Sequence, residues 1–372
     1  MKRIICCFVV LIMFCFAGCA PQEPPLLYFD EQRYIVGVWL SYAEIDAMLQ
    51  KDFKAEFDMV MENGLSGGIT DIFVHTVPFC DSYYPSKFYP QRTTQNFDVL
   101  SYMVDACHKN GLKIHAWINP YRVRTADNDI SKLPENSPAK RWLSDETQAN
   151  DINVSTFDGI YLNPASAEVR ALIISGVREI IDNYDVDGIH FDDYFYPTKD
   201  EVFDAQSYKD YCTATKNPIS LADFRRANVN ALISGVYTAV KFKNKRIAFS
   251  VSPTASIDEN YSRHYADVVA WVQNNCVDYI IPQLYFGFDY PDDNFKFDKL
   301  LADWQEITQN TQVKLVIGLA AYKIGTENEP DKTEWADGKD VIKEQINICK
   351  TTDGILGYVY FSYSAMKHQL CS

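Results

Sequence analysis

The stretch that decides the fold is Asp185-Val-Asp-Gly-Ile-His-Phe-Asp-Asp-Tyr-Phe-Tyr-Pro197. Its core, Gly188 to Phe191, has the pattern of a short buried strand, and two adjacent carboxylates follow at once. An ionised carboxylate beside a dry core is unfavourable unless it is paired or used in chemistry. The stretch therefore predicts a strand whose end carries a functional site.

Short apolar runs alternate with segments of helical period on both sides of this stretch. Strands alternating with helices indicate a parallel sheet covered by helices, and eight such units predict an α/β fold, a closed (β/α)8 TIM barrel with long loops after strands three and four. An open doubly wound sheet is the alternative, but it usually has a glycine-rich turn after its first strand, which is absent here. The predicted strands are 34–40, 71–75, 112–118, 187–191, 246–252, 279–284, 313–319 and 355–361.

Polar and aromatic side chains gather at the predicted C-terminal ends of the strands, where barrel enzymes place their active sites. Alternate residues of a strand face the same side, and one parity class carries these groups on nearly every strand. Rings stack on sugar faces, while amide, imidazole and guanidinium groups bind hydroxyls, so the pattern favours a carbohydrate pocket over simple packing of rings in the upper barrel. The residues expected to bind substrate are Trp39, His75, His115, Trp117, Asn119, Tyr121, Arg122, Tyr194, Gln283, Tyr285 and Tyr322.

The two carboxylates after strand four are the candidate catalytic residues, together with His190. Asp192 shares the parity of His190 and should point into the barrel mouth, whereas Asp193 points the other way if the strand persists. We expect Asp192 to act as nucleophile or base, with Asp193 and His190 setting its pKa and position. Glycoside hydrolysis uses two carboxyl groups, and the second is not evident from the sequence. Weak candidates in loops after strands two, six and seven are Asp81, Asp289 and Glu327.

Two other acids, Asp187 and Asp278, stand at the starts of strands four and six. The N-terminal ends of barrel strands form the face that serves stability. We therefore expect structural roles for both.

The first residues are predicted to be a targeting segment and not part of the fold. Lys2-Arg3 precedes an apolar run, Ile4 to Phe16, that is too short to span a bilayer comfortably. Phe16-Ala-Gly-Cys19 resembles the bacterial lipobox, in which the cysteine is lipidated; an ordinary signal peptide is the alternative. The expected division is a lipoprotein signal peptide at 1–18, a tether at 19–32 and the barrel at 33–372, in an extracytoplasmic, membrane-anchored bacterial lipoprotein.

Charge and composition bear on partners and cofactors. The formal net charge is −15, so nucleic acid, which needs a basic surface, is not an expected partner. His75, His115, His190 and Asp192 could form a metal site. Because strand one lacks His-x-His and HExxH is absent, we predict no metal and no other cofactor. A monomer is expected.

Several motifs together resemble one known family, glycosyl hydrolase-like 10, over about residues 33–365. The resemblance implies a (β/α)8 barrel, often on secreted or lipid-anchored bacterial proteins, and hydrolysis of glycosidic bonds. Some relatives act on peptidoglycan glycan strands stripped of their peptides. The motifs are Gly37-Val-Trp39, His115-Ala-Trp-Ile-Asn-Pro-Tyr-Arg122, Tyr161-Leu-Asn-Pro164, Asp187-Gly-Ile-His-Phe-Asp-Asp-Tyr-Phe-Tyr-Pro197, Ser252-Pro253 and Asp278-Tyr-Ile-Ile-Pro-Gln-Leu-Tyr285.

The resemblance also bears on the mechanism. His190-Phe-Asp192 is similar to the basic residue and acidic nucleophile that certain other barrel glycosidases place at the end of strand four. Ser250-Val-Ser252 offers no glutamate where some of them keep their acid. The sequence thus predicts a glycoside hydrolase acting on a cell-wall glycan, such as peptidoglycan strands, or on a related polysaccharide. The alternatives are a non-catalytic glycan-binding lipoprotein and a metal-dependent deacetylase or amidase.

Overall fold

The structure is a computed structural model, and it describes residues 33–145, 152–154, 159–326, 332–336 and 339–370. The predicted signal peptide and tether, with the candidate lipidation residue Cys19, lie outside the described residues. The candidate acid Glu327 lies outside them as well.

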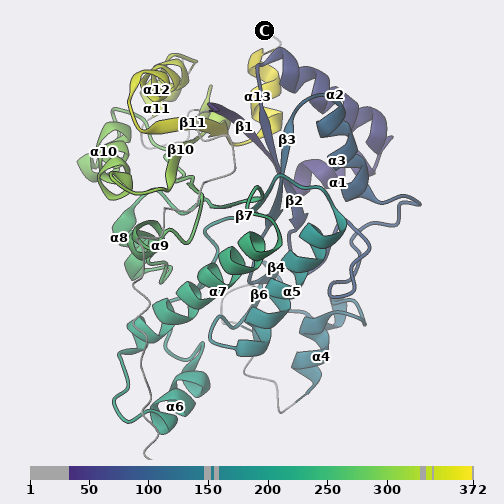
Figure 1. Cartoon of the computed structure of the whole chain (residues 1–372), viewed down its shortest axis with the longest axis vertical. Coiled ribbons are helices and arrows are strands. Elements are labelled where there is room, and N and C mark those ends of the chain that lie inside the picture. The colour runs from purple at the N-terminus through teal and green to yellow at the C-terminus, as the bar shows by residue number, and fades with distance from the viewer. Residues whose placement is uncertain (1–32, 146–151, 155–158, 327–331, 337–338, 371–372) are drawn as a thin grey trace, which may run out of the picture.

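Eight parallel strands form a closed barrel in the order β1-β11-β10-β9-β8-β7-β3-β2 (Figure 1). The predicted (β/α)8 barrel is confirmed, and each predicted strand is present. Strand β9 is shorter than predicted because Pro282, which follows it, has no N–H to donate to a ladder. The barrel strands are β1 (Ile35–Leu40), β2 (Asp71–Val77), β3 (Lys113–Ile118), β7 (Gly188–Phe191), β8 (Ala248–Val251), β9 (Tyr279–Ile280), β10 (Lys314–Leu319) and β11 (Ile355–Tyr360).

Helices cover the outside of the barrel, and several of them begin at a side chain that caps the first turn. Ser166 accepts a hydrogen bond from the Val169 N–H at the start of α5, and Asp98 accepts one from the Ser101 N–H at the start of α3. None of the helices within the described residues is long and apolar enough to cross a bilayer. The covering helices are α1 (Tyr42–Leu49), α2 (Phe53–Ser66), α3 (Val99–Lys109), α5 (Ala167–Asn183), α7 (Leu221–Lys243), α8 (Ile257–Ser262), α9 (Val268–Gln273), α10 (Phe297–Thr308), α11 (Lys332–Ala336), α12 (Lys339–Thr351) and α13 (Tyr363–Leu370).

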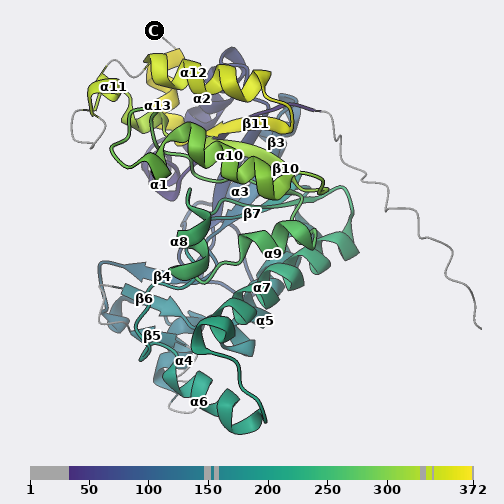
Figure 2. The ribbon, with the colours of Figure 1, turned by 90° about the vertical axis from the view of Figure 1, so that its left-hand side faces the viewer.

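The two long excursions project from one end of the barrel (Figure 2). The first, expected to be irregular, contains a three-stranded antiparallel sheet in the order β4-β6-β5. The second places α6 ahead of the long helix α7. The elements of the excursions are β4 (Arg122–Thr125), α4 (Pro138–Ser144), β5 (Ile152–Val154), β6 (Gly159–Leu162) and α6 (Ala205–Ala214).

The acids at the starts of strands are structural, as predicted. Asp187 accepts hydrogen bonds from the Lys113 ammonium at 2.6 Å and the Ile114 N–H at 3.0 Å. Asp278 pairs with Lys241 at 2.5 Å. Both therefore tie strand starts to their neighbours at the end of the barrel opposite the carboxyl ends.

Candidate functional site

A pocket of about 290 Å³ lies where the barrel strands end, as predicted for an active site. Most of the residues expected to bind substrate or act in catalysis line it. Those brought together here are Trp39, His75, Trp117, Asn119, Arg122, His190, Asp192, Asp193, Tyr194, Gln283, Tyr285 and Tyr322.

Asp192 is the most deeply buried acid of this pocket, with 3% of its surface exposed. The indole N–H of Trp117 donates to its Oδ2 at 3.0 Å, and the backbone N–H of Tyr194 donates to its Oδ1 at 3.4 Å. Burial, and then the negative charge of Asp193, raise the pKa of Asp192 to about 7. Both protonation states are therefore accessible at neutral pH, which suits a group that must give and take a proton.

Asp193 lines the same pocket, contrary to the expectation that it would point away. The expectation assumed that the strand persists, but β7 ends at Phe191, so strict alternation no longer applies to the next two residues. Burial raises the pKa of Asp193 too, although a hydrogen bond with Gln283 opposes the rise. The two adjacent acids form a carboxyl pair at one pocket wall.

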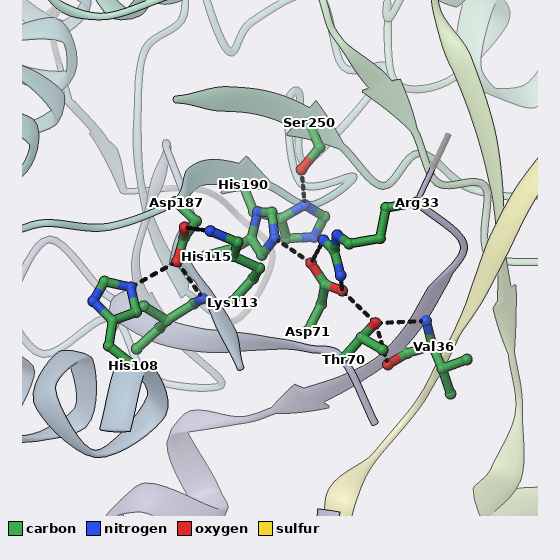
Figure 3. A network of polar contacts seen from close by, with 11 residues as sticks. Arg33, Val36, Thr70, Asp71, His108, Lys113, His115, Asp187, His190 and Ser250 are labelled. Carbon is green, nitrogen blue, oxygen red and sulfur yellow. Dashed lines mark hydrogen bonds and ion pairs between the residues drawn. The ribbon is translucent and has the colours of Figure 1, made fainter. Parts of the chain in front are cut away.

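The ring of His190 lies between Trp39 and Ser250 and hydrogen-bonds to both. The Trp39 indole N–H donates to its Nε2 at 3.0 Å, so that nitrogen carries no proton. Its Nδ1–H therefore donates to the Ser250 hydroxyl at 2.8 Å (Figure 3). Burial holds the pKa of His190 well below its ordinary value, and the ring is neutral. His190 thus fixes Trp39, whereas the pKa of Asp192 is raised by burial and by Asp193.

Within the described residues, three buried polar atoms of the pocket have no hydrogen-bond partner: His75 Nε2, Asn119 Oδ1 and Ser252 Oγ. The Tyr42 N–H donates to His75 Nδ1 at 3.0 Å, which leaves the proton of the neutral ring on Nε2. Buried polar groups nearly always have partners in folded proteins. A free ring N–H, a free amide oxygen and a free hydroxyl in one pocket therefore indicate a polar ligand with several hydroxyl or amide groups.

Aromatic rings form the rim of the pocket. The guanidinium of Arg122 lies over the Tyr194 ring at 3.8 Å. Tyr285 contacts Tyr322 edge-on, with ring centroids 5.9 Å apart. Tyr194 and Tyr322 are more than 40% exposed, so both rings are accessible to a ligand. Exposed rings around a polar floor suit a sugar, which offers apolar ring faces and polar edges.

Two predicted substrate-binding residues do not reach the pocket. His115 lies two residues before Trp117 on β3, and its Nε2 bonds to Asp71 Oδ1 at 3.0 Å near the other end of the barrel (Figure 3). Parity gives the face of a strand but not the height along it, and two residues span about 7 Å. Tyr121 is fully buried and packs against Phe195, with ring centroids 6.5 Å apart, so its ring does not reach the pocket.

The loop acids proposed as second carboxylates lie elsewhere. Asp81 pairs with Arg92 at 2.7 Å in a neighbouring cavity, and burial raises its pKa. Asp289 is on an exposed loop. Among the described residues that line the mouth pocket, the carboxylates are Asp192 and Asp193.

Further pocket residues were not assigned a role from the sequence. Each is among the first residues after the end of a barrel strand, and that position is the signal that identifies them. They are Ser41, Tyr42, Pro78, Phe79, Ser252 and Phe361. In the part of the chain that the structure describes, no three His, Cys, Asp or Glu side chains converge in a way that could hold a metal ion.

Comparison with known proteins agrees with this geometry. The family model described as Glycosyl hydrolase-like 10 matches residues 34–337. The chain belongs to this family. Membership in Glycosyl hydrolase-like 10 supports a glycosidase-type function and implies a carbohydrate substrate.

Two curated relatives are about a third identical to the chain over the aligned residues. It is 30% identical to glycosyl hydrolase YngK of Bacillus subtilis, covering 90% of this chain and 69% of that protein. It is 32% identical to glycosyl hydrolase DigH of Escherichia coli K12, covering 79% and 72%. Among solved structures, the PgaB (BpsB) glycoside hydrolase domain of Bordetella bronchiseptica has a TM-score of 0.62 at 11% identity, covering 91% of this chain and 97% of that one, which supports the fold.

Proposed function

We propose that this member of the Glycosyl hydrolase-like 10 family hydrolyses glycosidic bonds in a bacterial cell-wall glycan, with peptidoglycan strands as the expected substrate. One observation carries the proposal. Asp192 is buried beside Asp193 at the mouth of the pocket, and its pKa of about 7 is that of a carboxyl group able to act as an acid at neutral pH. Free polar atoms at the pocket floor support binding of a sugar there.

In this proposal Asp192 is the general acid and Asp193 stabilises positive charge. Asp192 is protonated below pH 7 and donates its proton to the glycosidic oxygen as the bond to the leaving sugar breaks. Asp193 is the ionised partner, and its negative charge faces the positive charge that develops on the sugar ring. A water molecule then adds to the anomeric carbon and gives a proton back to Asp192, which restores the acid. Trp117 holds the Asp192 carboxyl through its indole N–H, so the proton lies at a fixed place.

The location of the protein is part of the same proposal. Lipidation at Cys19 would anchor the barrel outside the cytoplasmic membrane, where peptidoglycan lies. Mass spectrometry of the mature protein tests this, because a lipidated Cys19 gives a defined mass increase on the first peptide. An unmodified N-terminus after cleavage would support secretion in its place.

The test of activity is incubation with peptide-free peptidoglycan strands and a panel of polysaccharides, with the products identified by mass spectrometry. Asp192→Asn should lower turnover by roughly 10³-fold while glycan binding persists, because the amide keeps the shape but cannot give a proton. The matched control is Asp289→Asn, which changes an exposed loop acid and should leave turnover unchanged.

The outcomes separate the proposal from its alternatives. Saturable binding with no product from any glycan indicates a non-catalytic binding protein. Loss of activity on chelation, with release of acetate or cleavage of an amide, indicates a metal-dependent deacetylase or amidase. Unchanged turnover in the Asp192→Asn variant overturns the assignment of Asp192.

A further inference from the structure

A second cavity continues from the mouth pocket. It has a volume of about 590 Å³ and shares Arg122 and Tyr194 with the mouth. Its walls come from the segment after β7, from β6 and from the residues that follow α8, which lie on the excursion side of the barrel (Figure 2). We call this cavity the side groove. A polymer that fills the mouth can therefore run on into the side groove without leaving the surface.

The side groove carries positive charge on a strongly acidic protein. The chain has a net charge of −15, yet Arg122, Lys199 and Arg263 all line this groove. Within the described residues, none of the three takes part in an ion pair. The acid of the lining, Asp200, is engaged with its own loop, since its Oδ1 accepts the Val202 N–H at 2.9 Å.

Arg122, Lys199 and Arg263 lie around the side groove. The guanidinium of Arg122 is held over the Tyr194 ring at 3.8 Å, at the junction of mouth and groove. At the far side, Arg263 and Lys199 both act on His264, because their charges add to burial in lowering its pKa to about 4. His264 is therefore neutral at pH 7 and can hydrogen-bond without adding charge.

Mouth and groove therefore have opposite electrostatic preferences. The mouth holds the carboxyl pair Asp192 and Asp193, which repels an anionic sugar. The side groove adds the Lys199 ammonium and the Arg263 guanidinium, which can bind a carboxylate through charge-assisted hydrogen bonds. Tyr161 and Tyr194 offer rings to the sugar itself.

We propose that the side groove is a subsite for a sugar unit that bears a carboxylate, and that it sets the register of the polymer by placing a neutral sugar at the mouth. The inference rests on the proposed glycosidase function and names the class of substrate. In a peptidoglycan strand freed of its peptides, every second sugar carries a carboxylate on its lactyl ether. In such a strand a sugar with a carboxylate in the side groove is adjacent to a neutral sugar, which would lie in the mouth.

The experiment compares two substrates that differ only in charge: peptide-free strands, and the same strands with their carboxylates converted to amides. The variant is Lys199→Ala/Arg263→Ala, which leaves the mouth intact. For wild type we expect kcat/KM on the acidic strands to exceed that on the amidated strands by about tenfold, the effect of two partly exposed ion pairs. The variant should lose this preference and hydrolyse amidated strands at the wild-type rate.

The control variant Arg178→Ala/Lys350→Ala removes one arginine and one lysine from exposed helical positions outside the groove. It should keep the full preference for acidic strands, which separates a local effect from a change in net charge. Equal hydrolysis of both substrates by wild type overturns the subsite and leaves the glycosidase function standing. A preference retained in the groove variant also overturns the subsite. No hydrolysis of either substrate overturns the proposed function and the subsite with it.

Discussion

Asp192 and Asp71 are both buried inside the same barrel, yet their surroundings act on their charges in opposite ways. Asp71, near the N-terminal ends of the strands, accepts two hydrogen bonds from the Arg33 guanidinium at 2.7 Å and one from His115 at 3.0 Å (Figure 3). Burial opposes its ionisation, but His115 and Arg33 outweigh burial and lower its pKa. Within the described residues no cation bonds to Asp192, and burial raises its pKa to about 7.

The difference separates stability from function. At the N-terminal ends of the strands the charge of Asp71 is fully paired, so the folded state prefers the ionised form of this carboxyl group. At the mouth, folding forces a carboxyl group into a place that disfavours its charge, which is the usual signature of a functional acid. An ionised aspartate therefore stabilises the folded state at Asp71 and destabilises it at Asp192.

The largest change in stability is expected from a substitution at the N-terminal ends of the barrel strands. Asp71→Asn leaves the Arg33 guanidinium without its carboxylate, and breaking a buried pair in this way costs about 3–5 kcal/mol. Urea unfolding at pH 7 measures the loss. The contribution of Asp71 should persist at neutral pH and fade only in strong acid, as pH falls through its lowered pKa. A loss below about 1 kcal/mol would contradict the pairing.

The next largest effect is a gain in stability, expected from a substitution at the mouth of the barrel. Because the pKa of Asp192 is about 7 in the folded protein against about 3.9 in an unfolded chain, the folded state loses stability as pH rises between these values. Asp192→Asn removes this penalty and should stabilise the protein at pH 8 by up to about 4 kcal/mol. Thermal unfolding of both proteins at pH 4 and pH 8 tests it. The gain should vanish at pH 4, and destabilisation at pH 8 would refute the account.

The smallest expected effect is the change in kcat/KM with each unit of pH. If Asp192 acts in its protonated form, kcat/KM should fall about tenfold for each pH unit above about 7, because the acid form is depleted at that rate. A pH–rate profile from 5 to 9 on peptide-free strands measures this. A rise through pH 7 would assign Asp192 the role of base or nucleophile, as first expected from the sequence.

Much of the fold could be predicted because the barrel strands are short apolar runs whose spacing leaves room for a helix between them. The excursion after β3 could not, since Arg122-Val-Arg-Thr125 on β4 is short and polar and lacks a strand pattern. Its antiparallel partner β6 comes more than thirty residues later, so its pairing leaves no local signal.

The candidate site could be predicted as a set of strand ends but not in detail. Parity placed Trp39, Trp117 and Asp192 correctly in the mouth. It failed for His115, because alternation does not specify height, and for Asp193, because β7 ends two residues earlier. The unpartnered atoms of His75 and Asn119 depend on what lies opposite them across the barrel, which only the folded structure reveals.

One strand, β3, holds His115 against Asp71 and Trp117 against Asp192. Its position along the barrel axis is therefore fixed by a bond at each level. A slip of two residues would keep every side chain on its proper face, so the apolar pattern alone would tolerate it. The two hydrogen bonds would both break in that slipped alignment. The register that pairs His115 with Asp71 at one end of β3 therefore also sets how deep the Asp192 carboxyl lies at the other end.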